Sequence, residues 1–98
     1  MIEIRTCEHG FSAVGHAGHG PPGHDIVCAA VSVLVQTFAL SAEELPGDQI
    51  SCDIQPGRAV IEYGNLSDRA RLLKDSLFIG VRAIAESYPE CVKFMSND

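Results

Sequence analysis

The sequence predicts an α+β fold in which two helices pack on an antiparallel or mixed sheet. Short segments of alternating or β-branched residues occur in pairs separated by turn residues, which is typical of hairpins. Two longer segments carry apolar residues at the spacing of a helix. Hairpins joined by helices give the order β-β-α-β-β-α-β, and 98 residues make one domain, residues 1–98.

The N-terminal segments predict a hairpin followed by a long loop. Ile2 to Cys7 alternates loosely and predicts a strand that ends in a turn at His9-Gly10. Phe11 to Gly15 is expected to return as the second strand. Residues 17–24 contain so many glycines and prolines that they predict an irregular loop.

The first helix is predicted over Ile26 to Leu45, before Pro46-Gly47 stops it. It is apolar on nearly every side, so we expect it to be largely buried between the sheet and the second helix. One polar stripe interrupts it at spacings of 3, 4 and 4, which keeps its members on one face. The members are Asp25, Cys28, Ser32 and Gln36.

Two interpretations of this stripe are open. Asp25 can cap the helix while Ser32 bonds to a backbone carbonyl one turn back. Alternatively the stripe forms the wall of a groove, where its polar groups meet water or a ligand. Burying them without partners would cost about 1–3 kcal/mol each. We favour the groove for the stripe as a whole, with Asp25 as the cap.

The second half predicts another hairpin, a helix and a last strand. Ile50 to Ile54 alternates between apolar and polar residues, and Arg58 to Tyr63 follows the Pro56-Gly57 turn. Apolar residues from Leu66 to Tyr88 then fall on one helical face. Asn65 or Ser67 is expected to cap this helix and Pro89 to end it. Cys91 to Phe94 predicts a last strand.

Composition narrows the class of function. The N-terminus has no apolar signal core and no segment is expected to reach a membrane-spanning length, so we expect a cytoplasmic protein that binds no membrane. A net charge of −6 argues against direct binding of nucleic acid, whose phosphates would be repelled, and suits a basic protein partner. Without a secretory signal, the four cysteines are expected to be free thiols, with Cys7, Cys52 and Cys91 buried in strands.

His16 and Cys28 are the residues with the strongest chemical potential. Cys28 lies in the predicted first turn of the helix, where unpaired amides favour a thiolate, and His16 stands twelve positions before it across the loop. A histidine returned by the loop can take the thiol proton, and the amide of Cys28 or a neighbour can stabilise an oxyanion. Asp25 could orient the imidazole. Spacing alone also fits a structural cysteine.

A metal or redox site is the weaker interpretation of the same region. Cys7, Cys28 and the four histidines, His9, His16, His19 and His24, match no familiar ligand spacing. A loop rich in glycine and proline would preorganise such a site poorly. We expect no cofactor and no metal, with His19 and His24 solvated in the loop and His9 in a turn.

At this motif the chain resembles the ribosomal-processing cysteine protease family Prp, also called YsxB-like. The matching residues are Gly15-His16-Ala17, Gly20, Gly23, Asp25-Ile26-Val27-Cys28-Ala29 and Ser32. The separation of His16 from Cys28 agrees without an insertion, and the layout is similar over almost the whole chain.

The resemblance implies a cysteine endopeptidase with Cys28 as nucleophile, His16 as base, and supporting roles for Asp25 and Ser32. The implied substrate is a large-subunit ribosomal protein precursor that loses a short hydrophobic N-terminal extension, and the implied enzyme is a homodimer. The implied substrate loop orders over bound substrate and comprises Gly18, His19, Gly20, Pro21, Pro22 and Gly23. The alternative is a non-enzymatic ribosome-associated assembly or binding protein that uses the loop for recognition.

Overall fold

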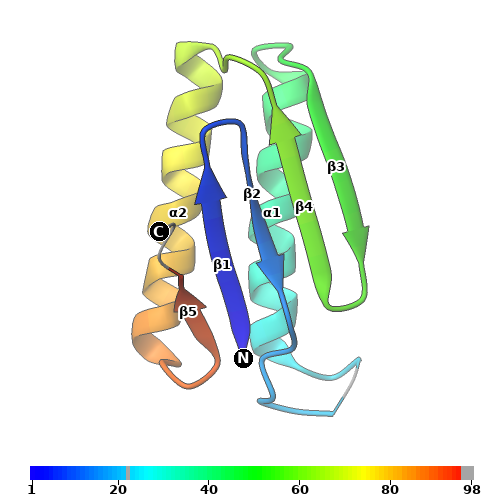
Figure 1. The fold of residues 1–98 in the computed structure, drawn as a ribbon, viewed down its shortest axis with the longest axis vertical. Helices are drawn as coiled ribbons and strands as arrows, with labels where there is room; N and C mark the ends of the chain where they lie inside the picture. Colours follow the sequence, from blue (N-terminus) through cyan, green and yellow to red (C-terminus); the bar gives the residue numbers. More distant parts are fainter. Residues whose placement is uncertain (22, 96–98) are drawn as a thin grey trace.

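The computed structural model describes residues 1–21 and 23–95, and within them two helices cover one face of a five-stranded sheet (Figure 1). The predicted class and order are confirmed. Pro22 of the predicted substrate loop lies outside the described residues. The elements are β1 (Ile2–Cys7), β2 (Gly10–Val14), α1 (Ile26–Glu44), β3 (Ile50–Gln55), β4 (Arg58–Tyr63), α2 (Asp68–Ser87) and β5 (Val92–Phe94).

The sheet is mixed, with the strand order β3-β4-β2-β1-β5. The pairs β1–β2, β2–β4 and β3–β4 are antiparallel, whereas β5 runs parallel to β1. The β5 pairing closes the edge of β1, with Ile2 opposite Val92 and Ile4 opposite Phe94. The N-terminal strand is therefore internal to the sheet.

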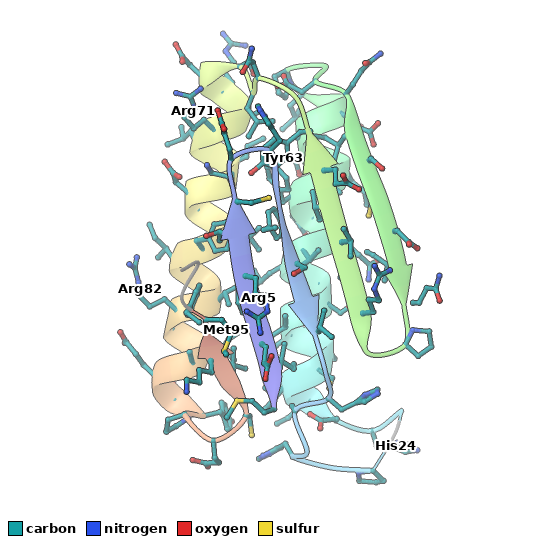
Figure 2. The ribbon with its side chains drawn as sticks, viewed as in Figure 1. Arg5, His24, Tyr63, Arg71, Arg82 and Met95 are labelled. Atoms are coloured by element: carbon teal, nitrogen blue, oxygen red, sulfur yellow. The ribbon has the colours of Figure 1, made fainter. Side chains whose placement is uncertain are left out.

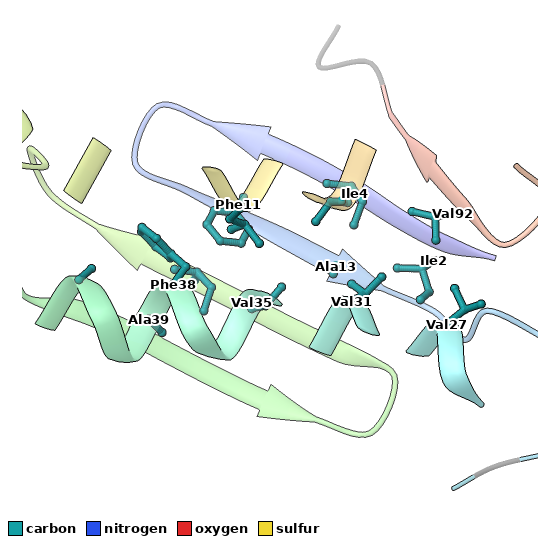
Figure 3. Close-up of a cluster of buried hydrophobic side chains, with 14 of the residues drawn as sticks. Ile2, Ile4, Phe11, Ala13, Val27, Val31, Val35, Phe38, Ala39 and Val92 are labelled. Carbon is teal, nitrogen blue, oxygen red and sulfur yellow. The ribbon is translucent and has the colours of Figure 1, made fainter. Parts of the chain in front are cut away.

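The core lies between the sheet and the helices. Ile4 and Phe11 point from the sheet toward Val31 and Phe38, as Figure 3 shows, and all four are buried. The ring of Phe11 lies 5.7 Å from that of Phe38, centroid to centroid, in a tilted arrangement. This alternation of buried and outward side chains along the strands is what one covered face requires.

The expectation that α1 lies between the sheet and α2 is wrong. Both helices lie side by side on the same face of the sheet, so each keeps a side facing solvent (Figure 1). Ile26, Val33 and Leu40 recur every seven residues on that side and are 62%, 58% and 65% exposed. These three apolar side chains on the outer side of α1 do not belong to the core, unlike the buried residues on its inner side.

The expectation that no segment reaches membrane-spanning length also needs correction. An 18-residue stretch of the 19-residue helix α1 has a mean hydropathy of 1.8, enough by length and composition to cross a membrane. Val27, Val35 and Phe38 of this helix are nevertheless buried against the rest of the fold. Core helices can meet the same length and composition criterion.

The helix ends follow identifiable side chains. Ser67, rather than Asn65, caps α2 by accepting a hydrogen bond from the N–H of Ala70 at 3.1 Å. The carboxylate of Asp48 in turn accepts from the N–H and the hydroxyl of Ser67, at 2.8 and 2.7 Å. This pair of bonds fixes the start of α2 against the segment that follows α1.

Two of the cysteines are not buried as expected. Cys52 lies on the edge strand β3, and Cys7 lies at the end of β1 on the face that carries Arg5. Figure 2 shows Arg5 on this open face of the sheet, which has no helix over it. Only Cys91, where the chain enters β5, is buried as predicted. Strand periodicity identified the elements but not which face or edge was covered.

Candidate functional site

A cleft of ≈ 610 Å³ lies where the loop of residues 16–25, the start of α1 and the tip of the β3–β4 hairpin meet. Figure 1 shows the hairpin turn and this loop toward the same end of the molecule. His16, Cys28 and Gly57 line the cleft, each from one of these three segments. Its apolar wall is formed by Ile2, Ala13, Val31, Val35, Ile54 and Ala59.

Asp25 joins the loop to the helix through four backbone amides. Its Oδ1 accepts from the N–H groups of Val27 and Cys28 at 2.9 and 3.1 Å, which confirms the predicted helix cap. Its Oδ2 accepts from His19 and Gly20 at 2.9 and 3.1 Å. Burial by itself would raise the pKa of Asp25, but these four donors stabilise the carboxylate and the net effect lowers the pKa below its ordinary value.

The partners of Asp25 bear on its proposed action on the histidine. Among the described residues, the hydrogen bonds of its carboxylate go to backbone amides and none goes to the imidazole of His16. The geometry therefore favours an influence through the shape of the loop and the helix start. Among the described residues, the carboxylate of Asp25 does not orient His16 through a hydrogen bond.

Cys28 is the third residue of α1 and its partly exposed side chain faces the cleft. The N–H of Ala17, the residue after His16, donates to the Cys28 sulfur at 3.3 Å. The amide of Cys28 itself already donates to Asp25. The Ala17 amide is thus directed at the sulfur itself, where it can stabilise a thiolate, and the expected oxyanion donor stays a prediction.

His16 leaves the end of β2 and is exposed over the turn at Gly57. The backbone before and at His16 is anchored on both sides, since the N–H of Gly15 donates to the Gly57 carbonyl at 2.8 Å and the amino group of Met1 donates to the carbonyl of His16. The structure thus brings His16 and Cys28 to the same cleft, although twelve positions separate them.

The polar stripe of α1 lines the cleft through Asp25, Cys28 and Ser32, as the groove interpretation predicts. Gln36 lies beyond these residues and its amide donates to the Ser32 hydroxyl at 2.8 Å. Ser32 is therefore paired with a side chain one turn ahead, rather than with the carbonyl one turn back. The hydroxyl remains on the cleft wall.

The other histidines take no part in this cleft. His9 lies in the turn after β1, and Figure 2 shows His24 in the loop at the lower end of the molecule. The ring of His19 rests edge-on against that of Tyr88, with centroids 5.1 Å apart. Within residues 1–21 and 23–95, no three His, Cys, Asp or Glu side chains gather in a way that could hold a metal ion.

Sequence reasoning missed the contribution of the β3–β4 hairpin. Ile54, Pro56, Gly57 and Ala59 all line the cleft, yet they stand about forty positions from His16 and carry no reactive groups. The Pro56-Gly57 pair did predict the turn. What it could not reveal was that β4 pairs with β2 and so carries this turn to the end of the strand that precedes His16.

Comparisons with known proteins give one consistent result. Residues 1–93 match the family model described as cysteine protease Prp. The ribosomal processing cysteine protease Prp of Staphylococcus aureus is 30% identical over 82 residues, which cover 81% of this chain and 77% of that protein. Nothing in the comparisons supports the non-enzymatic alternative.

Solved structures agree over the full fold. The crystal structure of S. aureus Prp with a covalently linked product peptide superposes with a TM-score of 0.83 at 24% identity, covering 95% of this chain and 94% of that one. A crystal structure from Streptococcus mutans gives a TM-score of 0.76 at 27% identity, with coverage of 95% and 89%. Both helices and the mixed sheet are thus shared with solved proteins.

Proposed function

Since this chain belongs to the cysteine protease Prp family, we propose that Cys28 is its nucleophile and His16 its general base. The observation that carries the proposal is the cleft shared by the two side chains, in which the amide next to His16 donates to the Cys28 sulfur. A backbone N–H directed at sulfur stabilises negative charge there. This is the charge that a nucleophilic thiolate carries.

The reaction follows from these roles. His16 accepts the thiol proton as the sulfur attacks the carbonyl carbon of the scissile peptide bond. The C–N bond then breaks, the protonated imidazole gives its proton to the leaving amine, and a thioester to Cys28 remains. Water, deprotonated by His16, attacks the thioester, so that the product acid leaves and the thiol is restored.

Asp25 and Ser32 have supporting roles in this proposal. Asp25 holds the start of α1, and with it Cys28, while attaching the loop through His19 and Gly20. Ser32 presents its hydroxyl on the cleft wall one turn beyond Cys28. Gly18, Gly20 and Gly23 of the substrate loop line the cleft. The loop would close over a bound peptide and exclude water from the thioester.

For the substrate we propose the N-terminal extension of a ribosomal protein precursor. The matched S. aureus protein is named as a ribosomal processing protease. The apolar wall of the cleft suits a short hydrophobic extension, since burial of apolar surface is the main source of such affinity. A net charge of −6 attracts the basic body of a ribosomal protein and repels nucleic acid.

We further propose a cytoplasmic homodimer that binds neither membrane nor nucleic acid. The support for a dimer is the exposed apolar outer side of the helices, with Ile26, Val33 and Leu40 on α1 and Leu72 and Ile79 on α2. Exposed apolar side chains thus recur on both helices, and large apolar patches are typical of protein–protein interfaces.

The test is cleavage of a peptide that carries an apolar ribosomal N-terminal extension ending in Phe. We expect cleavage at the end of the extension, reduced at least about 10³-fold in both Cys28→Ala and His16→Ala. Cys52→Ala is the matched control, because it removes an exposed thiol away from the cleft and should cleave normally. Activity that survives Cys28→Ala would overturn the proposal.

A further inference from the structure

Gly57 occupies the turn between β3 and β4 and lies directly against the imidazole of His16. A Cβ atom added to Gly57 would stand 2.6 Å from His16 Nε2, 2.9 Å from Cε1 and 3.3 Å from Cδ2. Non-bonded carbon and nitrogen atoms do not approach to 2.6 Å, so any side chain at this position would displace the ring. The absence of a side chain is what leaves room for the histidine.

The same residue anchors the backbone from which His16 departs. The Gly57 carbonyl accepts the N–H of Gly15 at 2.8 Å, beyond the last paired residues of β2 and β4, Val14 and Arg58. Gly57 itself has φ +74°, a left-handed conformation that glycine adopts without the steric penalty of other residues. One residue therefore fixes both the strand end that carries His16 and the surface on which its ring rests.

No hydrogen bond holds the His16 ring within residues 1–21 and 23–95. His16 is exposed, and among the described residues its imidazole makes no hydrogen bond to a carboxylate. The carboxylate expected to orient it, Asp25, is occupied by backbone amides. Packing against a glycine turn takes the place of the acidic partner that orients the histidine of many hydrolytic triads.

We propose that Gly57 is the positioning residue for the general base His16, and this rests on the proposed function. Because Gly57 has no side chain, the imidazole packs directly against its backbone. The hydrogen bond from the Gly15 N–H to the Gly57 carbonyl also holds the segment that carries His16. Because Nε2 is the nearest ring atom, a methyl group at residue 57 would both tilt the ring and cover a nitrogen that exchanges protons. Misplacement of a catalytic group by about 1 Å costs on the order of 10² in rate.

The experiment compares Gly57→Ala with Gly47→Ala. Gly47 has φ +84°, close to the φ of Gly57, but an added Cβ would meet nothing within 4 Å, and the residue follows α1 away from the cleft. Both variants carry the same backbone strain, so both should lower Tm by a similar amount, about 4–8 °C. Only Gly57→Ala brings a methyl group against the histidine.

We expect kcat for the extension peptide to fall by about 10²-fold in Gly57→Ala with KM changed less than about threefold, while Gly47→Ala stays within about twofold of the native enzyme. The NMR chemical shifts of the His16 ring should change in Gly57→Ala alone. Equal kcat values in the two variants, or unchanged His16 ring shifts in Gly57→Ala, would overturn the inference.

Two further measurements keep the outcomes distinct. If Gly57→Ala fails to fold, Gly57→Asn supplies the same Cβ with a residue that tolerates the left-handed conformation better, and Gly47→Asn is its control. If the native enzyme itself fails to cleave, the proposed function fails, whereas the chemical shifts of the His16 ring in the two glycine variants still test the contact.

Discussion

Replacing Asp25 with asparagine separates two jobs done by one carboxylate. Oδ1 accepts from the helix amides of Val27 and Cys28, and Oδ2 accepts from the loop amides of His19 and Gly20. Asparagine has nearly the same shape and is a good N-cap, so its one oxygen can keep the helix amides. Its NH₂ group must then face the loop amides, donor against donor.

The structure sets the size of the effect. Two of the four hydrogen bonds are lost, both on the loop, and bonds to a charged acceptor are about twice as strong as neutral ones. We therefore expect exchange of the His19 and Gly20 amides to accelerate by about tenfold or more. Exchange of the Val27 and Cys28 amides should change by less than about threefold, and kcat/KM should fall by roughly 10- to 100-fold because the loop is detached from the cleft.

Hydrogen exchange followed by NMR measures the four amides separately, and peptide cleavage measures activity on the same sample. Asp48→Asn is the matched control, since Asp48 also accepts two hydrogen bonds but from Ser67 at the start of α2. It should leave cleavage within about twofold. Equal acceleration at loop and helix amides in Asp25→Asn, or native activity despite a freed loop, would refute the assignment of the two oxygens.

Three further predictions follow from the same structure. The fold lowers the pKa of Asp25, so its carboxylate contributes stability that is complete above the ordinary pKa of 3.8 and is lost as the pH falls through the lower pKa of the folded state. The difference in Tm between the native chain and Asp25→Asn should therefore shrink below about pH 4. A constant difference down to pH 2 would contradict this. Phe38 is 2% exposed at the centre of the core, so Phe38→Ala should lower the free energy of unfolding by about 3–5 kcal/mol in urea titrations, with a loss under 1 kcal/mol contradicting the packing described. Leu40 is 65% exposed on the outer side of α1, so Leu40→Glu should convert the proposed dimer to monomers in light scattering and make Tm independent of protein concentration. A dimer that persists would place the interface elsewhere.

The sequence was most informative where local chemistry determines local structure. The cap at Asp25, the start of α1 and the loop before it depend on residues within a few positions of one another, so their side chains identify them. His16 and Cys28 were paired by their spacing and by the residues that flank them. Both side chains line one cleft, and their catalytic roles stay a prediction.

The sequence was least informative where distant segments meet. The outer side of α1 and the core side both carry large apolar side chains, so periodicity could not indicate which of them was covered. The exposure of Cys52 depends on β3 being an edge strand, and the role of Gly57 depends on β4 pairing with β2. These pairings are set by the assembly of the whole sheet, which no local pattern encodes.

The parallel pairing of β5 with β1 has a consequence for how the enzyme is made. The N–H of Ile2 bonds to the Cys91 carbonyl and the N–H of Met95 bonds to the Ile4 carbonyl, so one side of the first strand is completed by residues about ninety positions later. A nascent chain that lacks this last segment presents an unpaired strand edge beside Ile2, a residue of the cleft wall. The proposed base and nucleophile, His16 and Cys28, precede residue 30, whereas the strand that completes this edge begins more than sixty positions after Cys28, at Val92.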